Sequence, residues 1–254
     1  MPDHFDLGLA DRVVLVTGGV RGVGAGISAV FAGQAATVIT CARRPVEGLP
    51  YEFHSCDIRD PDAVGSLIEA IVERHGRLDV VVNNAGGSPH VPAADASPRF
   101  HQKVIELNLL GMLHVSQAVN AVMQKQSRGG AIVSISSVSG RRPSPGTAAY
   151  GAAKAGVDSL TTSLAVEWAP KVRVNAVVAG MVATEQAELF YGDSVSQAVV
   201  ASTVPLGRFA DPTEIGWAAA FLASDAASYI SGATLAVHGG GEPPPYLSVS
   251  NANN

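Results

Sequence analysis

The sequence predicts a doubly wound α/β fold, in which a mostly parallel sheet of about seven strands carries helices on both faces. Two observations support this prediction. Short β-branched segments alternate with segments of helical spacing along nearly the whole chain. The strand segments are also apolar without strict alternation, as expected where helices cover both faces of a parallel sheet. No repeat or linker divides the 254 residues, so we expect one domain over 1–254, ending in a tail at 241–254.

The first three elements are a strand, a helix and a second strand. The stretch RVVLVT at 12–17 is β-branched and stops at glycines, helical spacing follows, and TVITCA at 37–42 returns to strand composition. The same alternation predicts the other elements in order. Strands are expected at 51–55, within 78–86, and at 131–137, 172–178 and 233–237; helices are expected at 61–76, about 98–124, about 148–168 and after Asp211.

Residues 181–207 join the sixth expected strand to the last expected helix and are longer than an ordinary connection. Long connections of this kind are usually functional lids. The candidate lid surface is apolar and consists of Met181, Leu189, Phe190, Tyr191 and Val204. An apolar lid favours an alicyclic, steroid-like or acyl ketone or alcohol as substrate, and the alternative is that these side chains only pack on the core.

Composition excludes several classes of partner. Charged residues make up 15% of the chain and the net charge is −5, with only 17 Lys and Arg. No basic footprint for nucleic acid or for anionic lipid is therefore visible, and small-molecule partners fit better. Cys41 and Cys56 are too few for a disulfide framework, and no secretory leader opens the chain, so we expect a cytoplasmic protein. We assign no metal site.

A glycine-rich turn, TGGVRGVG at 17–24, lies where the first strand meets the first helix. Ligands of doubly wound sheets bind at such a point, because strand carboxyl ends and a helix N-terminus converge there. Glycines let the backbone approach a pyrophosphate closely, and the exposed N–H groups favour its negative charge. The turn therefore predicts a dinucleotide site, and the alternative is a glycine turn with no ligand.

Two further polar segments follow strands at the same edge. The turn NNAG at 83–86 comes after the fourth expected strand, and Asn and Gly tolerate left-handed backbone there. Asp57 follows the third strand, where its carboxylate is placed to accept a hydrogen bond from an adenine amino group. The plainer interpretation of Asp57 is a cap at the start of a loop.

The stretch AYGAAKAG at 149–156 carries a tyrosine and a lysine four residues apart among small neighbours. Residues i and i+4 share one helix face, about 5 to 6 Å apart at Cβ, so the Lys154 ammonium can approach the Tyr150 phenol. Ionising a phenol near neutrality requires a shift of roughly three pKa units, on the order of 4 kcal/mol, and a nearby cation favours the charged form. A surface Tyr and Lys on a packed helix is the alternative.

Two polar residues complete the expected catalytic group. Ser137 ends the strand AIVSISS, where its hydroxyl can hydrogen-bond a substrate oxygen while Tyr150 gives or takes the proton. Asn108 lies inside an expected helix, although Asn is a mediocre helix former. We expect Asn108 to hold a water, and the alternative is that it simply faces solvent.

Together these motifs resemble the short-chain dehydrogenase/reductase (SDR) family, in its shorter form of about 250 residues, from Asp11 to about Gly240. The resemblance implies a Rossmann sheet, catalytic roles for Ser137, Tyr150, Lys154 and Asn108, and hydride transfer between nicotinamide and a ketone or secondary alcohol. A nucleotide sensor or scaffold that lost the chemistry is the alternative. With the glycine turn, the resemblance gives the expected cofactor contacts: Gly18, Arg21, Gly22, Val23, Gly24, Arg43, Asp57, Ile58, Asn84, Ala85, Gly86, Tyr150, Lys154, Gly180, Val182 and Thr184.

The sequence departs from the family pattern at two places. Ala179 and Gly180 stand where family members usually have Pro-Gly, which alters the turn under the nicotinamide. His238 stands where Asp is common, and we assign it no role. The resemblance also implies a homo-oligomer, a dimer or more often a tetramer, built on the two long helices and the last helix and strand.

The end of the second strand predicts which nicotinamide cofactor binds. An acidic side chain there commonly binds the adenosine ribose and repels a 2′-phosphate, whereas this chain has Ala42 followed by Arg43. Arg21 in the glycine turn offers a second guanidinium. We therefore expect NADP(H) to be preferred, with NAD(H) as the alternative if both arginines face solvent.

Overall fold

The computed structural model describes residues 7–244, 246 and 249. Within these residues a seven-stranded sheet has the order β3-β2-β1-β4-β5-β6-β7, and every neighbouring pair is parallel. The strands are β1 (Val13–Thr17), β2 (Thr37–Ala42), β3 (Glu52–Ser55), β4 (Val80–Asn83), β5 (Gly130–Ser137), β6 (Val172–Ala179) and β7 (Thr234–Val237). The predicted doubly wound α/β class is confirmed.

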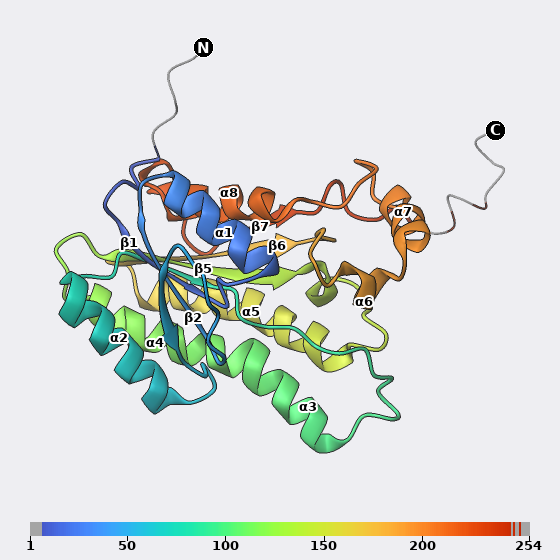
Figure 1. The fold of residues 1–254 in the computed structure, drawn as a ribbon, viewed down its shortest axis with the longest axis horizontal. Coiled ribbons are helices and arrows are strands. Elements are labelled where there is room, and N and C mark those ends of the chain that lie inside the picture. Colours follow the sequence, from blue (N-terminus) through green and yellow to red (C-terminus); the bar gives the residue numbers. More distant parts are fainter. Residues whose placement is uncertain (1–6, 245, 247–248, 250–254) are drawn as a thin grey trace, which may run out of the picture.

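Helices cover both faces of this sheet (Figure 1). The α-helices are α1 (Gly22–Gly33), α2 (Pro61–His75), α3 (Pro98–Ile105), α4 (Gly111–Met123), α5 (Ala148–Glu167), α6 (Ala187–Tyr191), α7 (Ser194–Ser202) and α8 (Pro212–Ala223). Helices α1 and α8 pack together on one face, and α2, α4 and α5 cover the other. Short turns of other helix types are η1 (Glu106–Leu110), η2 (Val138–Gly140) and η3 (Asp225–Ala227).

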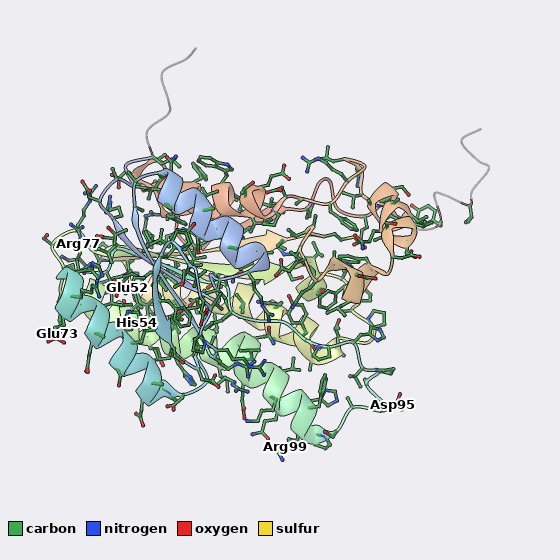
Figure 2. The ribbon with its side chains drawn as sticks, in the orientation of Figure 1. Glu52, His54, Glu73, Arg77, Asp95 and Arg99 are labelled. Atoms are coloured by element: carbon green, nitrogen blue, oxygen red, sulfur yellow. The ribbon has the colours of Figure 1, made fainter. Side chains whose placement is uncertain are left out.

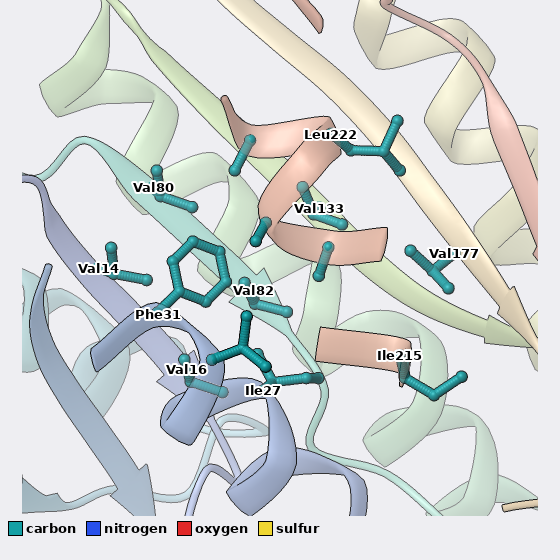
Figure 3. Close-up of a cluster of buried hydrophobic side chains, with 14 of the residues drawn as sticks. Val14, Val16, Ile27, Phe31, Val80, Val82, Val133, Val177, Ile215 and Leu222 are labelled. Atoms are coloured by element: carbon teal, nitrogen blue, oxygen red, sulfur yellow. The ribbon is translucent and has the colours of Figure 1, made fainter. Parts of the chain in front are cut away.

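The core on the α1–α8 face joins strands far apart in the sequence (Figure 3). Phe31 of α1 is fully buried among the valines of β1 and β4, and Ile215 of α8 is fully buried in the same cluster. Burying such side chains stabilises the fold by about 1.5 to 3 kcal/mol each. The strands therefore read as continuous apolar segments because both of their faces are covered.

The strand order reverses between β2 and β4, which both pair with β1. Because all strands are parallel, their carboxyl ends meet at one edge of the sheet. Gly18, Asn84 and Gly180 follow three of these strands, and Ser137 ends a fourth. A crevice at this edge is where a doubly wound sheet binds its ligand.

Local signals in the sequence set where several helices begin and end. The Asp60 carboxylate accepts from the backbone N–H groups of Asp62 and Ala63 and so begins α2. The left-handed Gly76, with φ at 73°, ends it. Asp211 and Glu214 form a reciprocal capping box at the start of α8.

Two segments differ from the sequence-based expectation. The helix expected at 98–124 is present, but residues 106–110 form a π-helical turn between α3 and α4. The expected lid, 181–207, contains the helices α6 and α7, which the sequence did not predict. Single π turns inside α-helices often mark functional sites.

A polar cluster stabilises the β3 edge of the sheet, on the side of the molecule away from α6 and α7 (Figure 2). The Glu52 carboxylate is 2.7 Å from Nε2 of His54 and 2.9 Å from Nε2 of His75. Hydrogen bonds from these imidazoles hold the pKa of Glu52 below its usual range, although burial acts the other way. The charged side chains on this edge strand discourage pairing with another strand.

No helix among the described residues has both the length and the apolar content to cross a membrane. The expected tail, 241–254, falls largely outside the described residues. The assignment of 1–254 to one domain therefore stays a prediction.

Candidate active site

A cleft of about 950 Å³ opens at the carboxyl edge of the sheet. Every residue expected to contact the cofactor or to act in catalysis lines this cleft, with the exception of Asn108. The expected residues that line it are Gly18, Arg21, Gly22, Val23, Gly24, Arg43, Asp57, Ile58, Asn84, Ala85, Gly86, Ser137, Tyr150, Lys154, Gly180, Val182 and Thr184. Their roles in binding and catalysis remain predictions.

The glycine turn between β1 and α1 is built for close backbone contact. Gly18 has φ at 63°, in the left-handed region that favours glycine. A Cβ on Gly24 would lie 2.1 Å from the carbonyl oxygen of Gly18, so only glycine fits this helix turn. Asn84 holds the turn from the neighbouring strand, since its Nδ2 donates to the carbonyl oxygens of Thr17 and Gly18 at 3.0 and 3.2 Å.

An anionic oxygen already occupies the N-terminus of α1. The backbone N–H of Gly22 donates to the Glu185 carboxylate at 3.2 Å. This contact shows that the turn accepts a negatively charged oxygen, as a phosphate site at a helix N-terminus requires. The glycine turn, its hydrogen bond to the Glu185 carboxylate and the size of the cleft are consistent with a bound dinucleotide.

Tyr150 and Lys154 lie one turn apart on α5 and face the end of β5. The Lys154 Nζ is 5.6 Å from the centre of the Tyr150 ring and donates to the carbonyl oxygen of Ile135 at 2.7 Å. Ser137 ends β5 and lines the cleft beside them. Ser137, Tyr150 and Lys154 therefore meet at one place. Asn108 lies next to this group, since a Cβ on Gly86 would lie 2.6 Å from the Asn108 Oδ1 and 3.6 Å from the Lys154 Nζ.

Burial controls the charges of this group. Burial lowers the pKa of Lys154 to about 8, and the nearby Asp158 carboxylate acts in the other direction. Burial also raises the pKa of the Tyr150 phenol, while the Ser137 hydroxyl opposes the rise and Tyr191 adds to it. The sequence predicted that the Lys154 cation would lower the Tyr150 pKa. In the structure the net shift of the Tyr150 pKa is upward, because desolvation of the phenolate dominates.

Asn108 lies behind the cleft in the π turn and is fully buried. Its Nδ2 donates to the carbonyl oxygens of Gly87 and Val104, both at 2.9 Å, and its Oδ1 accepts from the Gly87 N–H at 2.7 Å. Both amide protons are thus in use. In the structure the Asn108 side chain holds the backbone at Gly87. Its proposed role in holding a water stays a prediction.

At the other end of the cleft Asp57 is held by a neighbour that the sequence analysis did not consider. The Arg59 Nε donates to both carboxylate oxygens of Asp57, at 2.9 and 3.2 Å. Hydrogen bonds from Arg59 lower the pKa of Asp57, although burial opposes them, and Arg43 contributes a further favourable charge. Arg43 and Asp57 therefore lie near each other where the adenosine is expected.

The lid contributes aromatic side chains to the cleft. Phe190 and Tyr191 at the end of α6 line it, and the Tyr191 ring packs against Phe209 with centroids 4.8 Å apart. The other expected lid residues do not line the cleft: Leu189 is exposed, Met181 is half-buried and Val204 is buried. Val204 therefore fits the alternative given above, in which the side chain packs in the interior and does not contact the substrate.

Below the lid, Gly180 and His238 pack closely. A Cβ on Gly180 would lie 2.8 Å from the Cα of His238, so the family-like glycine is required even without the preceding proline. His238 follows β7 and does not line the cleft.

Sequence analysis missed three residues of the cleft region. Thr17 Oγ1 accepts from the backbone N–H groups of Asn84 and Ala85 at 3.0 and 3.1 Å, and a polar residue at the end of a buried strand was the available signal. No sequence pattern indicated the contact of Glu185, because its partner, the Gly22 N–H, lies 163 residues away in the chain. Arg142 lines the cleft from the loop between η2 and α5. In the sequence it directly follows Arg141, and nothing in the pattern indicates which of the two arginines reaches the cleft.

Comparisons with known proteins agree with this geometry. The family model described as enoyl-(acyl carrier protein) reductase matches residues 18–242. Oxidoreductase UcpA of Escherichia coli O157:H7 is 38% identical over 95% of this chain and 98% of its own. The 3-oxoacyl-[acyl-carrier-protein] reductase FabG of Thermotoga maritima is 36% identical over 91% of this chain and 98% of its own.

A solved structure is also similar. Ligand-free aldohexose dehydrogenase of Thermoplasma acidophilum superimposes with a TM-score of 0.88 at 32% identity, over 97% of this chain and 98% of that one. These matches span nearly the whole chain, including the segments that line the cleft. The chain therefore belongs to the short-chain dehydrogenase/reductase family and is an NAD(P)-dependent oxidoreductase that acts on CH–OH and C=O groups.

Proposed function

We propose that the enzyme reversibly transfers a hydride between a nicotinamide cofactor and a ketone or secondary alcohol, with Tyr150 as general acid or base. The observation that supports this most is the convergence of Ser137, Tyr150 and Lys154 in the cleft that also contains the glycine turn. When bound, the nicotinamide supplies or accepts the hydride. The protein's own groups supply orientation and proton transfer.

Each polar group of the site has a distinct task in this proposal. The Ser137 hydroxyl donates a hydrogen bond to the substrate oxygen, which favours the charge that develops there. The Tyr150 hydroxyl gives its proton to that oxygen or takes it back. Lys154, whose pKa is about 8, is mostly protonated at neutral pH and favours the phenolate as the proton leaves. The backbone that Asn108 fixes shapes the floor of the cleft.

We propose an apolar substrate body. Phe190, Tyr191 and Pro145 line the cleft that also contains Tyr150, and their rings suit an alicyclic, steroid-like or acyl group. The test is a panel of ketones and secondary alcohols followed by the absorbance of the reduced cofactor, with Ser137→Ala as the control for the site. Apolar members should have the highest kcat/KM. Small polyols or sugars as much the best substrates would contradict the apolar body.

We propose that NADP(H) is preferred to NAD(H). Arg21 and Arg43 both line the cleft, and Arg43 lies near Asp57 where the adenosine is expected. Removing one charge-assisted contact typically costs about 1.5 to 3 kcal/mol, or about tenfold or more in affinity. Fluorescence titration of NADPH and NADH into the natural chain and into Arg43→Ala measures this. Equal or tighter binding of NADH by the natural chain would refute the preference.

We propose a homo-oligomer, a dimer or a tetramer. Large apolar side chains are exposed on three elements that the family resemblance assigns to subunit contacts: Trp217 of α8, Val166 of α5 and Leu235 of β7. Tyr229, between α8 and β7, is fully exposed as well. Exposed apolar groups on neighbouring elements mark interaction surfaces. Light scattering at micromolar concentration should give a multiple of the 26.0 kDa chain mass, and a monomer mass would refute this proposal.

We also propose a cytoplasmic location. Cys41 and Cys56 are buried and unpaired, which suits a reducing compartment. Burial raises the pKa of the Cys41 thiol to about 12, so this thiol is poorly reactive. Fractionation of the native host, with the protein followed by antibody, tests the location, and recovery outside the cytoplasmic fraction would contradict it.

A further inference from the structure

The loop at 141–147 brings a positive charge to the substrate end of the cleft. This loop leaves η2 just after Ser137 and enters α5 just before Tyr150, so both of its ends are tied to the proposed catalytic pair. Four of the cleft-lining residues in this region are polar, in contrast to the aromatic lid. They are Ser139, Arg142, Ser144 and Thr147.

The contacts of Arg142 leave part of its guanidinium available to a ligand. Its Nη2 is 2.8 Å from Oε1 of Glu242, and its Nη1 donates weakly to the carbonyl oxygen of Pro143 at 3.4 Å. Glu242 does not line the cleft, whereas Arg142 does. A guanidinium has five N–H donors in a planar fork, so most of its donors have no partner among the described residues.

Tyr191 links this guanidinium to the reacting phenol. Burial raises the pKa of Tyr191, Arg142 opposes that rise, and Glu242 adds to it. Tyr191 in turn adds to the rise in the pKa of Tyr150. Arg142, Tyr150 and Tyr191 all line the same cleft, so the guanidinium and the phenol face one cavity.

The adjacent Arg141 does not share the position of Arg142 in the cleft. The Arg141 Nε donates to Oδ2 of Asp158 at 3.1 Å, and its Nη2 donates to Oγ1 of Thr234 at 2.5 Å. Arg141 does not line the cleft. Of two neighbouring arginines on one loop, one is used in the scaffold and the other faces the substrate region.

We propose that Arg142 binds a carboxylate of the substrate, so that the enzyme acts on ketones or secondary alcohols that carry an anionic end. This inference rests on the proposed function and narrows it. The apolar body contacts Phe190 and Tyr191, while the carboxylate meets the free face of the guanidinium. Arg and carboxylate groups form paired, charge-assisted hydrogen bonds. Glu242 keeps the guanidinium oriented from outside the cleft.

Keto acids of graded length test this assignment. The probes are 4-oxopentanoate, 5-oxohexanoate and 6-oxoheptanoate, each compared with its methyl ester, which has the same ketone and no charge. Steady-state rates are measured with the reduced cofactor for the natural chain and for Arg142→Gln, Arg142→Lys and Arg141→Gln. Thermal melting of each variant confirms that it is folded, as expected for exposed arginines.

We expect the natural chain to prefer the best acid to its ester by about tenfold or more in kcat/KM, mainly through KM. The preference should fall to about one in Arg142→Gln, remain in part in Arg142→Lys, and stay unchanged in Arg141→Gln. Turnover of the esters with no preference for any acid would overturn this inference alone, as would a preference that survives Arg142→Gln. Absence of turnover in both series would count against the proposed reaction as well.

Discussion

The buried ammonium of Lys154 should make the stability of the protein depend on pH in a predictable direction. Its pKa is about 8 in the folded chain and near its ordinary 10.5 when unfolded. Between these values the unfolded chain binds more protons, so the free energy of unfolding contributed by this group rises with pH. Below pH 8 the folded protein holds Lys154 as a buried charge, so the contribution of this group to the free energy of unfolding is least favourable in that range.

The magnitude follows from the two pKa values. A difference of about 2.5 units corresponds to about 3 kcal/mol of destabilisation at pH 7 relative to a neutral side chain. Raising the pH from 7 to 9 should recover about 1 kcal/mol of this, because the folded amine loses its proton while the unfolded one keeps it. Other groups also titrate, so the effect must be isolated by a variant.

Lys154→Met isolates it, because methionine has similar length and no charge. Urea denaturation of the cofactor-free protein at pH 7, 8 and 9 gives the free energy of unfolding of both chains. The natural chain should gain about 1 kcal/mol relative to Lys154→Met over this range. Lys125→Met, which removes an exposed lysine, is the matched control and should show no such trend. A constant difference between the natural chain and Lys154→Met would refute the reasoning.

Four further substitutions test the packing. Gly24→Ala should cost about 1 to 3 kcal/mol and weaken cofactor binding, because its Cβ would meet the Gly18 carbonyl oxygen. Gly33→Ala, in the same helix with open space around it, should be neutral or stabilise by about 0.5 to 1 kcal/mol; equal costs at both sites would contradict the clash. Phe31→Ala should cost about 3 to 5 kcal/mol in denaturation, and a loss below 1 kcal/mol would contradict its core position. Asn108→Ala should cost about 1 to 3 kcal/mol and lower kcat, because it removes the hydrogen bonds that hold the Gly87 backbone and leaves the Val104 carbonyl oxygen without this donor; unchanged stability would contradict the positioning role.

Local sequence patterns were sufficient to predict the sheet. Most strands are short β-branched segments whose composition can be recognised without knowing their neighbours, and TVITCA at 37–42 matches β2 residue for residue. The exception is β3, EFHS, which has no β-branched residue. The cleft then followed from a general property of parallel sheets, whose carboxyl ends share one edge. This is why Gly18, Asn84 and Ser137, from three separate segments, could be expected together.

Contacts between distant segments could not be predicted in the same way. Asn108 was expected in a helix, but the π turn and its bonds to Gly87 depend on the packing of two segments 21 residues apart. The Arg142–Glu242 pair joins residues that are a hundred positions apart in the sequence. The sign of the Tyr150 pKa shift depends on burial, which a spacing of four residues does not reveal.

Tyr150→Phe tests the central claim most directly, because it removes one hydroxyl and keeps the ring. The measurement is kcat/KM for the best ketone, made together with the dissociation constant of the reduced cofactor. The account predicts a loss of about 10²-fold or more in kcat/KM, as expected for a general acid or base, with cofactor binding nearly unchanged. Turnover equal to that of the natural chain, with cofactor still bound, would show that Tyr150 is not the proton donor or acceptor.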